Sequence, residues 1–157
     1  MVVQQAGVGD AEEILKVQRL AYRSEAELYG NPGIPPMIQT LAELQAQFED
    51  HLILKGTIEG GRIVGSVRAR VVQGTCYIGR LVVHPEFQNR GLGTALMHEI
   101  EARFPQAERF ELFTGHRSAK NLHLYRNLGY RELRRERVDA TLELVYLEKP
   151  NRAARRG

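Results

Sequence analysis

The sequence contains a single cysteine, Cys76, and no tryptophan, and none of its apolar runs approaches the roughly 18 residues that a membrane-spanning helix needs. One cysteine excludes a framework of internal disulfides. Residues 1–5 lack the basic stretch and the apolar core of a secretory signal. These absences lead us to expect a soluble protein in the reducing environment of the cytoplasm.

An excess of basic charge is also missing from most of the chain, although the isoelectric point is near 9.2. Three of the 22 Lys and Arg residues lie in the acid-free stretch 151–157, which leaves 19 basic against 19 acidic side chains in residues 1–150. Nucleic-acid surfaces are typically basic clusters on a folded face. The length of 157 residues fits one domain. We therefore predict a single domain over residues 1–150, a short basic tail over residues 151–157, and no nucleic-acid partner.

Two capping signals mark helix starts in the first third of the chain. Asp10 with Glu13, and Thr40 with Glu43, have capping-box spacing, and apolar residues recur at helical spacing after each pair. The pattern predicts one helix over 11–28 and a second, short helix after Thr40. Between them, residues 29–37 contain three prolines and two glycines, which predict a loop without regular structure.

The rest of the chain predicts strands around two further helices. Strands are expected at 52–59, 62–73, 75–83, 110–114, 130–138 and 141–149, and helices at 92–104 and 118–128. The passage from 77 to 114 is long enough for a parallel crossover, whereas the hairpins are antiparallel. The prediction is an α+β domain whose mixed, mostly antiparallel, twisted sheet contains one parallel pair and is flanked by helices.

Gly91 and Gly93 stand directly before the helix predicted at 92–104. Two glycines separated by one residue leave a surface without Cβ atoms beside free helix N-terminal amides, and Arg90 adds positive charge. This pattern favours a phosphate site. The Gly-Lys-Ser/Thr end of a P-loop is absent, and so is the third glycine of a dinucleotide-binding fingerprint. A purely structural tight turn is the alternative.

Two segments together carry a resemblance to a known family. The first is Leu-Val-Val-His-Pro at 81–85 followed by Gln-Asn-Arg-Gly-Leu-Gly at 88–93, and the second is Asn-Leu-His-Leu-Tyr-Arg-Asn-Leu-Gly-Tyr at 121–130. The two segments and the order of the predicted elements resemble the GCN5-related N-acetyltransferase (GNAT) superfamily. The resemblance implies an acyl-CoA N-acyltransferase-like fold in which the two parallel strands splay apart. It also implies acetyl-coenzyme A as the acyl donor.

The resemblance further implies which residues bind the donor. The diphosphate is expected on the loop 88–94, the pantetheine arm along the strand that ends at 81–83, and one face of the helix 118–128 beside that arm. A bulge near Leu81 would aim a backbone N–H at the thioester oxygen. The expected donor-binding residues are Leu81, Val82, Val83, Gln88, Asn89, Arg90, Gly91, Leu92, Gly93, Thr94, Asn121 and Tyr125.

Catalysis would need a group that protonates the departing thiolate and a base that deprotonates the amine. Tyr125 lies four residues after Asn121, on the same side of a helix, and is the candidate acid; a core aromatic is its alternative role. The strand 75–83 contains no carboxylate. Glu111 is therefore the candidate base, with Glu25, Glu27 or a water chain as alternatives. Alternatively, Glu111 has only a structural role, as a surface or salt-bridged residue.

Other reactive side chains are expected to have ordinary roles. Cys76 is predicted to be a buried thiol, and His116 and His123 lack zinc spacing, so we expect no metal. Lys120 and Arg117 are either contacts for the 3′-phosphate of coenzyme A or exposed charges. Met37, with the prolines around it, either lines the acceptor pocket or packs in a surface loop.

We therefore predict an N-acetyltransferase that moves the acetyl group of acetyl-CoA directly to a primary amine, on a small molecule or a peptide. The alternative is an acyl-CoA-binding regulatory module without efficient transfer, which the carboxylate-free strand would suit. The sequence does not select the acceptor. Pairing through an exposed strand into a homodimer is a further expectation, and no membrane partner is expected.

Overall fold

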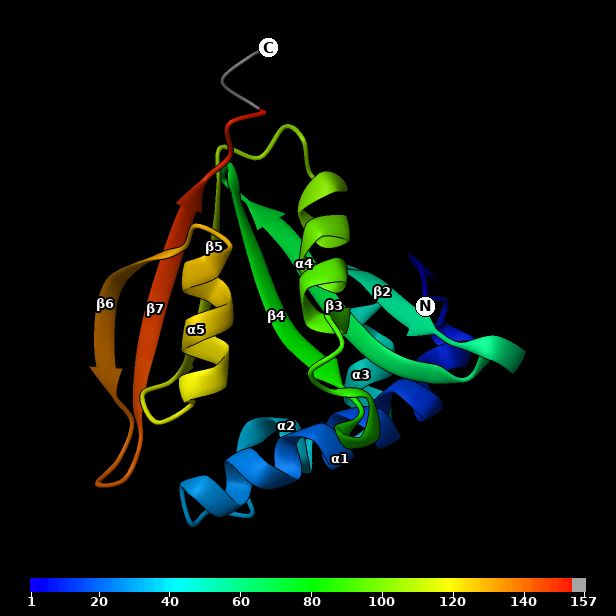
Figure 1. Ribbon diagram of the computed structural model, residues 1–157, viewed down its shortest axis with the longest axis horizontal. Coiled ribbons are helices and arrows are strands. Elements are labelled where there is room, and N and C mark those ends of the chain that lie inside the picture. The colour runs from blue at the N-terminus through cyan, green and yellow to red at the C-terminus, as the bar shows by residue number, and fades with distance from the viewer. Residues whose placement is uncertain (154–157) are drawn as a thin grey trace.

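Seven strands form one mixed sheet in the order β1-β2-β3-β4-β5-β7-β6 in the computed structural model, which describes residues 1–153 (Figure 1). The strands are β1 (Val2–Gln5), β2 (Leu52–Thr57), β3 (Ile63–Val72), β4 (Thr75–Val83), β5 (Arg109–Gly115), β6 (Arg131–Arg137) and β7 (Glu143–Pro150). Only β4 and β5 pair in parallel; the other neighbours are antiparallel. The predicted mixed sheet with one parallel pair is confirmed.

Helices cover both faces of this sheet and make three layers (Figure 1). They are α1 (Ala11–Leu28), α2 (Pro35–Ile38), α3 (Leu41–Gln47), α4 (Leu92–Ala102) and α5 (Ala119–Asn127), with 3₁₀ turns at Val8–Asp10, Glu59–Gly61 and Pro85–Phe87. Leu96 and Ile100 of α4 pack with Leu122 of α5 in one core, and Ile14 and Leu44 of α1 and α3 belong to the other. Burial of each such side chain stabilises the fold by about 1.5–3 kcal/mol.

Some local expectations hold and others do not. Thr40 and Glu43 form the predicted capping box, with Glu43 N donating to Thr40 Oγ1 at 3.1 Å and Thr40 N to Glu43 Oε1 at 2.9 Å. Asp10 does not cap α1: its carboxylate accepts from Gly7 N and Lys55 Nζ, and Glu13 accepts from Ile63 N on β3. The first of the two predicted capping boxes therefore does not form, because Asp10 and Glu13 accept from other partners.

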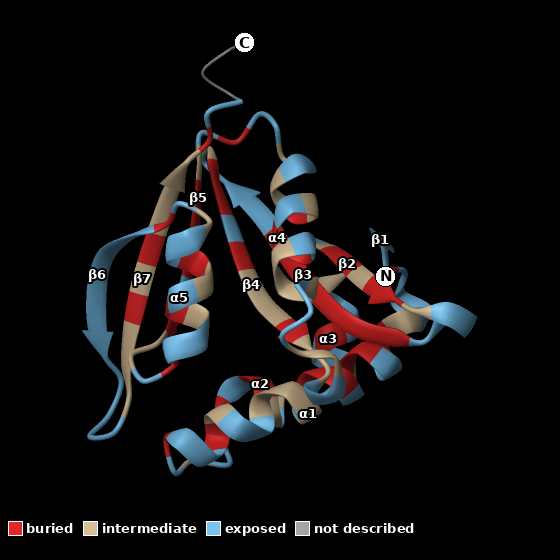
Figure 2. Cartoon of the chain, viewed as in Figure 1, coloured by how far each residue is buried: buried red, intermediate tan, exposed pale blue. Residues whose placement is uncertain are grey.

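The proline-rich segment is more regular than predicted. Residues 35–38 form the short helix α2, because prolines at its first two positions need no amide partner there. Strand β1 was not predicted; it pairs antiparallel with β2. Strand β5 was expected to be buried, and most of it is, but Phe113 points outward and is 50% exposed. Figure 2 shows that exposure extends along the whole of the edge strand β6.

The feature that positions the site is the divergence of β4 from β5. Their parallel pairing covers only Thr75, Cys76 and Tyr77, opposite Arg109 to Glu111. Beyond Tyr77 the two strands separate, and α1 runs across the open end (Figure 1). The later residues of β4 therefore have no strand partner on the β5 side. The predicted splayed pair is confirmed.

A β-bulge lies in the diverging part of β4. Ser66 pairs with Val82 and Arg68 with Gly79, so Arg80 and Leu81 together stand opposite the single residue Val67. Arg80 has φ +51°, in the left-handed region. The extra residue reverses the alternation of side chains, so Leu81 packs against the core under α4 and α5 while Val82 joins the core under α1. The predicted bulge near Leu81 is present.

The described beginning of the predicted tail is tied to the domain. Asn151 is buried, and its side-chain amide donates to the carbonyls of Phe104, Pro105 and Ala107. The arginines at 155 and 156 lie outside the described residues. Among residues 1–153, no helix combines the length and apolar character that crossing a bilayer would require.

Candidate active site

The loop before α4 has the backbone conformation that its glycines predicted. Asn89 has φ +64° and Gly91 has φ +80°, and Gly91 is the N-cap residue of α4 without a side-chain cap. The first bond of the helix runs from Ala95 N to Gly91 O. The amides of Leu92, Gly93 and Thr94 precede that bond and therefore have no partner within the helix. Together with the helix dipole they present a positive end at the loop.

A cavity of about 370 Å³ lies in front of these amides. We call it the first cavity. Its walls come from four places: the end of β4, the glycine loop, α1 and α5. The predicted donor residues that line it are Leu81, Val82, Val83, Gln88, Asn89, Gly91, Leu92, Gly93, Thr94 and Asn121. The remaining lining residues are Ala21, Tyr22, Ser24, Glu25, Phe87, Lys120, His123, Leu124 and Asn127.

Glycine stands at these two positions of the loop for different physical reasons. A Cβ on Gly91 would meet nothing within 4 Å, but its φ of +80° is one that side-chain-bearing residues rarely adopt. Gly93 has no such conformation, and a Cβ there would make ordinary contacts with Leu124 at 3.5 Å and Leu81 at 3.9 Å. The protein itself would therefore accept an alanine at Gly93. The conformation of the turn explains Gly91 only. At Gly93, the absence of a side chain leaves the backbone uncovered at the wall of the first cavity.

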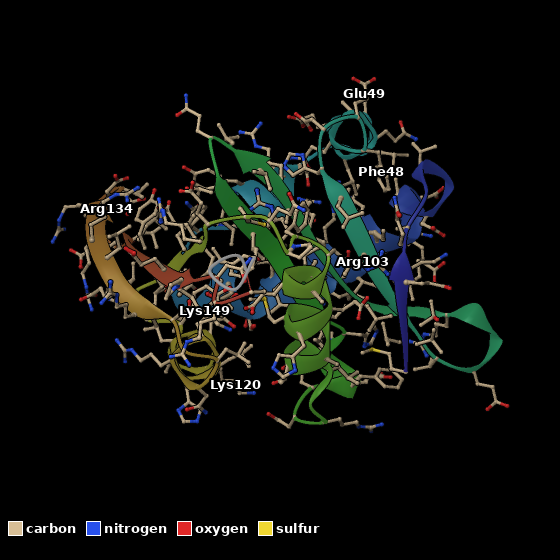
Figure 3. All side chains as sticks on the ribbon, turned by 90° about the horizontal axis from the view of Figure 1, so that it is seen from above. Phe48, Glu49, Arg103, Lys120, Arg134 and Lys149 are labelled. Atoms are coloured by element: carbon tan, nitrogen blue, oxygen red, sulfur yellow. The ribbon has the colours of Figure 1, made fainter. Side chains whose placement is uncertain are left out.

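Of the three basic side chains predicted near the phosphates, one lines the first cavity and two do not. Lys120 extends from α5 and lines the first cavity (Figure 3). Arg90 does not line it; its guanidinium lies 5.2 Å from the centre of the half-buried ring of Phe87, beside the loop. Arg117 is also absent from the cavity wall. The structure thus brings Lys120, but neither arginine, to the cavity wall.

A second cavity, of about 330 Å³, lies deeper between the diverging strands, α1, α2 and the turn between β6 and β7. Tyr125 lines this second cavity rather than the first. Its ring is buried against Tyr130, and burial, with the nearby Tyr22 and Glu25, raises the pKa of its hydroxyl well above the ordinary value. The hydroxyl therefore keeps its proton throughout the physiological range.

Four residues line both cavities: Tyr22, Glu25, Leu81 and Asn121. The cavities consequently meet at the bulge of β4, beneath α1. Asn121 is fixed there by a hydrogen bond from its amide nitrogen to Thr114 Oγ1, at 3.3 Å, which joins α5 to β5. A donor in the first cavity and an acceptor in the second would meet at this junction.

Glu25 is the carboxylate at the junction. It is half-buried and accepts a hydrogen bond of 2.5 Å from Ser118 Oγ. Ser118 is held in turn by Tyr29, whose hydroxyl lies 2.9 Å from Ser118 Oγ and accepts from Arg117 N. This chain of hydrogen bonds fixes one carboxylate oxygen and joins α1 to the start of α5.

Glu111 stands outside both cavities. It is buried on β5 at the paired end of the strands and forms ion pairs with Arg109 at 2.9 Å and with Arg134 at 3.8 Å. Arg134 extends from β6 at the edge of the sheet (Figure 3). The salt-bridged alternative for Glu111 describes its surroundings, and Glu25 is the candidate carboxylate that lines both cavities. Glu27, the other alternative, is exposed and lines neither cavity.

Sequence reasoning missed most of the contribution of α1. Tyr22, Glu25 and Tyr29 recur at i, i+3 and i+7, which is one face of a helix, and this polar stripe beside the apolar one was the available signal. Arg80 was missed because nothing local shows that a bulge turns it into the second cavity. Met37 is not in the cavity wall, whereas its neighbours Pro35 and Pro36 are.

The remaining candidate residues have structural surroundings. Cys76 is fully buried, and burial raises the pKa of its thiol to about 12, so the thiol stays protonated. His116 packs beside Tyr29, with Nδ1 against the backbone of Glu143, and His123 contacts Asn127. Over the described part of the chain, no three His, Cys, Asp or Glu side chains gather as a metal site would require.

The model of the acetyltransferase (GNAT) family matches residues 17–130, and the chain belongs to this family. Among curated proteins, UPF0157 protein YqkA of Bacillus subtilis (strain 168) is 31% identical over 122 residues, which are 78% of this chain and 35% of that protein. The chain therefore spans about a third of the length of this relative.

Solved structures share the fold at low identity. The ribosomal-protein-S18-alanine N-acetyltransferase of Escherichia coli has a TM-score of 0.80 at 18% identity, over 96% of this chain and 93% of that one. A phosphinothricin acetyltransferase of Sinorhizobium meliloti in complex with AcCoA gives 0.79 at 16%, over 96% and 88%. An N-acetyltransferase of Thermoplasma acidophilum in complex with coenzyme A gives 0.73 at 17%, over 96% and 99%.

Proposed function

We propose that this protein transfers the acetyl group of acetyl-CoA directly to a primary amine. The observation that carries the proposal is the meeting of two cavities at the β4 bulge, one opening onto the glycine loop and the other enclosed by α1, α2 and the splayed strands. A direct transfer needs donor and acceptor held together in this way. Membership of the acetyltransferase family supports the proposal.

The first cavity suits coenzyme A. The free amides at the start of α4 would hold the diphosphate, and the low wall at Gly93 gives it access to the backbone. The side of β4 that faces away from β3 after Tyr77 has no strand partner, so pantetheine amides can pair with it as an added strand would. Lys120 supplies a cation for a phosphate. Structural neighbours crystallised with AcCoA or coenzyme A support this choice of ligand.

The reaction forms one C–N bond and breaks one C–S bond. The amine nitrogen attacks the thioester carbon, the carbonyl oxygen gains negative charge, and a backbone N–H of the bulge near Leu81 stabilises that charge. The intermediate collapses with the coenzyme thiolate as leaving group. The nitrogen, which is positively charged after the attack, releases a proton to solvent as the amide forms. Tyr125 supplies the proton that the departing thiolate takes up and regains one from solvent; this step is useful rather than indispensable because a thiol pKa is about 8.5.

The amine must lose a proton before it attacks, because a lysine-type ammonium has a pKa of about 10.4. We assign Glu25 as the base, since it is the carboxylate that reaches both cavities. The bond from Ser118 orients one of its oxygens and leaves the other for the ammonium. This assignment replaces Glu111, whose ion pairs with Arg109 and Arg134 occupy its carboxylate.

Thiol release over a panel of primary amines tests the proposal. We expect release of coenzyme A to depend on the amine and an N-acetyl product of matching stoichiometry by mass spectrometry. Binding of coenzyme A without amine-dependent release by any member of the panel would contradict catalysis and favour the acyl-CoA-binding regulatory module.

A further inference from the structure

The second cavity contains a guanidinium whose buried nitrogen has no partner. Arg80 occupies the bulge of β4 and lines the cavity. Its Nε is buried, and among the described residues it has no hydrogen-bond partner. Leaving a buried donor of a charged group without an acceptor is destabilising. Such a group in a cavity wall is explained when a ligand supplies the acceptor.

A second guanidinium lies close to the first. Arg68, on the neighbouring strand β3, is 4% exposed, and its side chain donates to Gln39 Oε1 at 3.0 Å. Burial, and then the positive charge of Arg80, lower the pKa of Arg68 to about 10. No ion pair within residues 1–153 includes either arginine. A buried cation next to a half-buried one, with no carboxylate paired to either, is costly unless an anion joins them.

Coenzyme A does not account for this charge. Arg80 is absent from the first cavity, where the loop amides and Lys120 face the phosphates. The carboxylate nearest in the cavity wall is Glu25, which is engaged by Ser118 and faces the junction. The second cavity thus has a carboxylate at its junction with the first cavity and, in its wall, a guanidinium whose Nε has no hydrogen-bond partner among the described residues.

We infer that the acceptor is a small zwitterion, an amino acid whose carboxylate is held by Arg80 while its amine faces Glu25. The inference rests on the proposed function, whose second cavity it fills. Guanidinium binds carboxylate with two parallel hydrogen bonds, and the charge of Arg68 adds long-range attraction. Binding removes the repulsion between the two arginines by placing a negative charge beside them.

The lining of the second cavity indicates what side chain the amino acid carries. Besides these polar groups, the lining is largely apolar, with Ile34, Pro36, Ile78 and Leu144 among its members. A volume of about 330 Å³ is at the low end of small-molecule pockets, which span roughly 300–1,000 Å³. An amino acid with an apolar side chain fits this space and lining, whereas a long polyamine would place cations against Arg80.

Matched ligand pairs test the inference. L-leucine, L-methionine and L-phenylalanine would each be compared with the corresponding carboxamide, which keeps the amine and side chain but removes the negative charge. Calorimetry on the protein saturated with coenzyme A measures binding, and thiol release with acetyl-CoA measures KM and kcat. We expect at least one acid to bind 10-fold or more tightly than its amide, with the preference expressed in KM.

Variants then assign the preference to Arg80. Arg80→Gln is expected to weaken binding of the preferred acid 10- to 100-fold while leaving its amide unchanged, and Arg80→Lys is expected to restore part of the difference. Removing an unpaired charge should not lower the unfolding midpoint. Arg70→Gln is the matched control, because Arg70 lies on the neighbouring strand β3 but is exposed and pairs with Asp50 at 3.6 Å.

The outcomes separate the two proposals. Acids that bind no better than their amides, or an Arg80→Gln variant that weakens both equally, would overturn the inference even if other amines are acetylated. A preference for the acid in calorimetry without turnover of any amine would uphold the anion site and contradict the acetyltransfer. Tight binding of spermidine in place of the amino acids would also overturn it.

Discussion

At the scale of the residue, Tyr125 has one property that the acid role requires. Its raised pKa keeps the hydroxyl protonated throughout the physiological pH range, so the proton is available but the acid is weak. We expect Tyr125→Phe to lower kcat about 10- to 100-fold, at or below the lower end of general acid catalysis, with little change in the Kd of coenzyme A. Steady-state kinetics and calorimetry measure the two quantities.

Tyr130→Phe is the matched control for this variant. Tyr130 packs against Tyr125, but its hydroxyl donates to Glu101 at 2.8 Å and lines neither cavity. Its loss should reduce the free energy of unfolding by about 1 kcal/mol without a matching loss of kcat. A Tyr125→Phe enzyme with wild-type kcat across a pH series would remove the acid role.

Glu25 makes a prediction about pH. The base is needed while the amine carries its proton, so its loss should lower activity most at neutral pH. Glu25→Gln keeps an oxygen for Ser118 but cannot take a proton. We expect kcat/KM at pH 7 to fall about 100-fold or more, with partial recovery near pH 10, where the amine deprotonates unaided.

Glu27→Gln tests whether that effect is specific. Glu27 is on the same helix, two residues away and exposed, so its charge is removed without touching the cavities. It should retain wild-type kcat/KM and the wild-type pH profile. Glu111→Gln should instead lower stability, because it leaves Arg109 and Arg134 without their carboxylate. If Glu111→Gln rather than Glu25→Gln lowered kcat/KM at pH 7 with recovery near pH 10, the base assignment would be wrong.

At the scale of the element, two substitutions in the glycine loop distinguish a glycine needed for backbone conformation from a glycine needed to leave space for a ligand. Gly91→Ala places a Cβ at φ +80° and should destabilise the fold by about 1–2 kcal/mol. Gly93→Ala adds a methyl group at ordinary contact distances and gives a residue that favours helix, so stability should stay level or rise by up to about 1 kcal/mol. Urea unfolding of both variants measures the difference, and equal losses would contradict this explanation of the two glycines.

The elements also show what a sequence can reveal. The strand–loop–helix unit from β4 to α4 was predictable because its signals are local: an alternating strand, glycines at a helix start, and apolar residues at helical spacing. Capping was predictable where local partners suffice, as at Thr40, and wrong at Asp10, where Lys55 and Gly7 compete for the carboxylate. The helix α2 was missed because its prolines were interpreted as breakers rather than as first-turn residues.

At the scale of the whole molecule, the site depends on contacts between segments far apart in the chain. The donor side could be predicted because most of it comes from one continuous stretch, 81–94, and from α5. The junction could not, since Glu25 meets Ser118 across 93 positions of sequence and Arg80 is aimed by the register of β3 against β4. The surroundings of Glu111 could not be predicted either, because its partner Arg134 comes from β6, which is two positions away from β5 in the sheet.

The central claim is that coenzyme A binds with its diphosphate on the backbone at the start of α4. Calorimetric titration of coenzyme A into the wild-type protein, Gly93→Val and the exposed control Gly9→Val tests it most directly. We expect one coenzyme A site per chain in the wild type and in the control. In Gly93→Val we expect a Kd raised at least about 30-fold, or 2 kcal/mol, in protein whose circular dichroism remains that of the wild type. No binding heat in the wild type, or an unchanged Kd in a folded Gly93→Val protein, would contradict the claim.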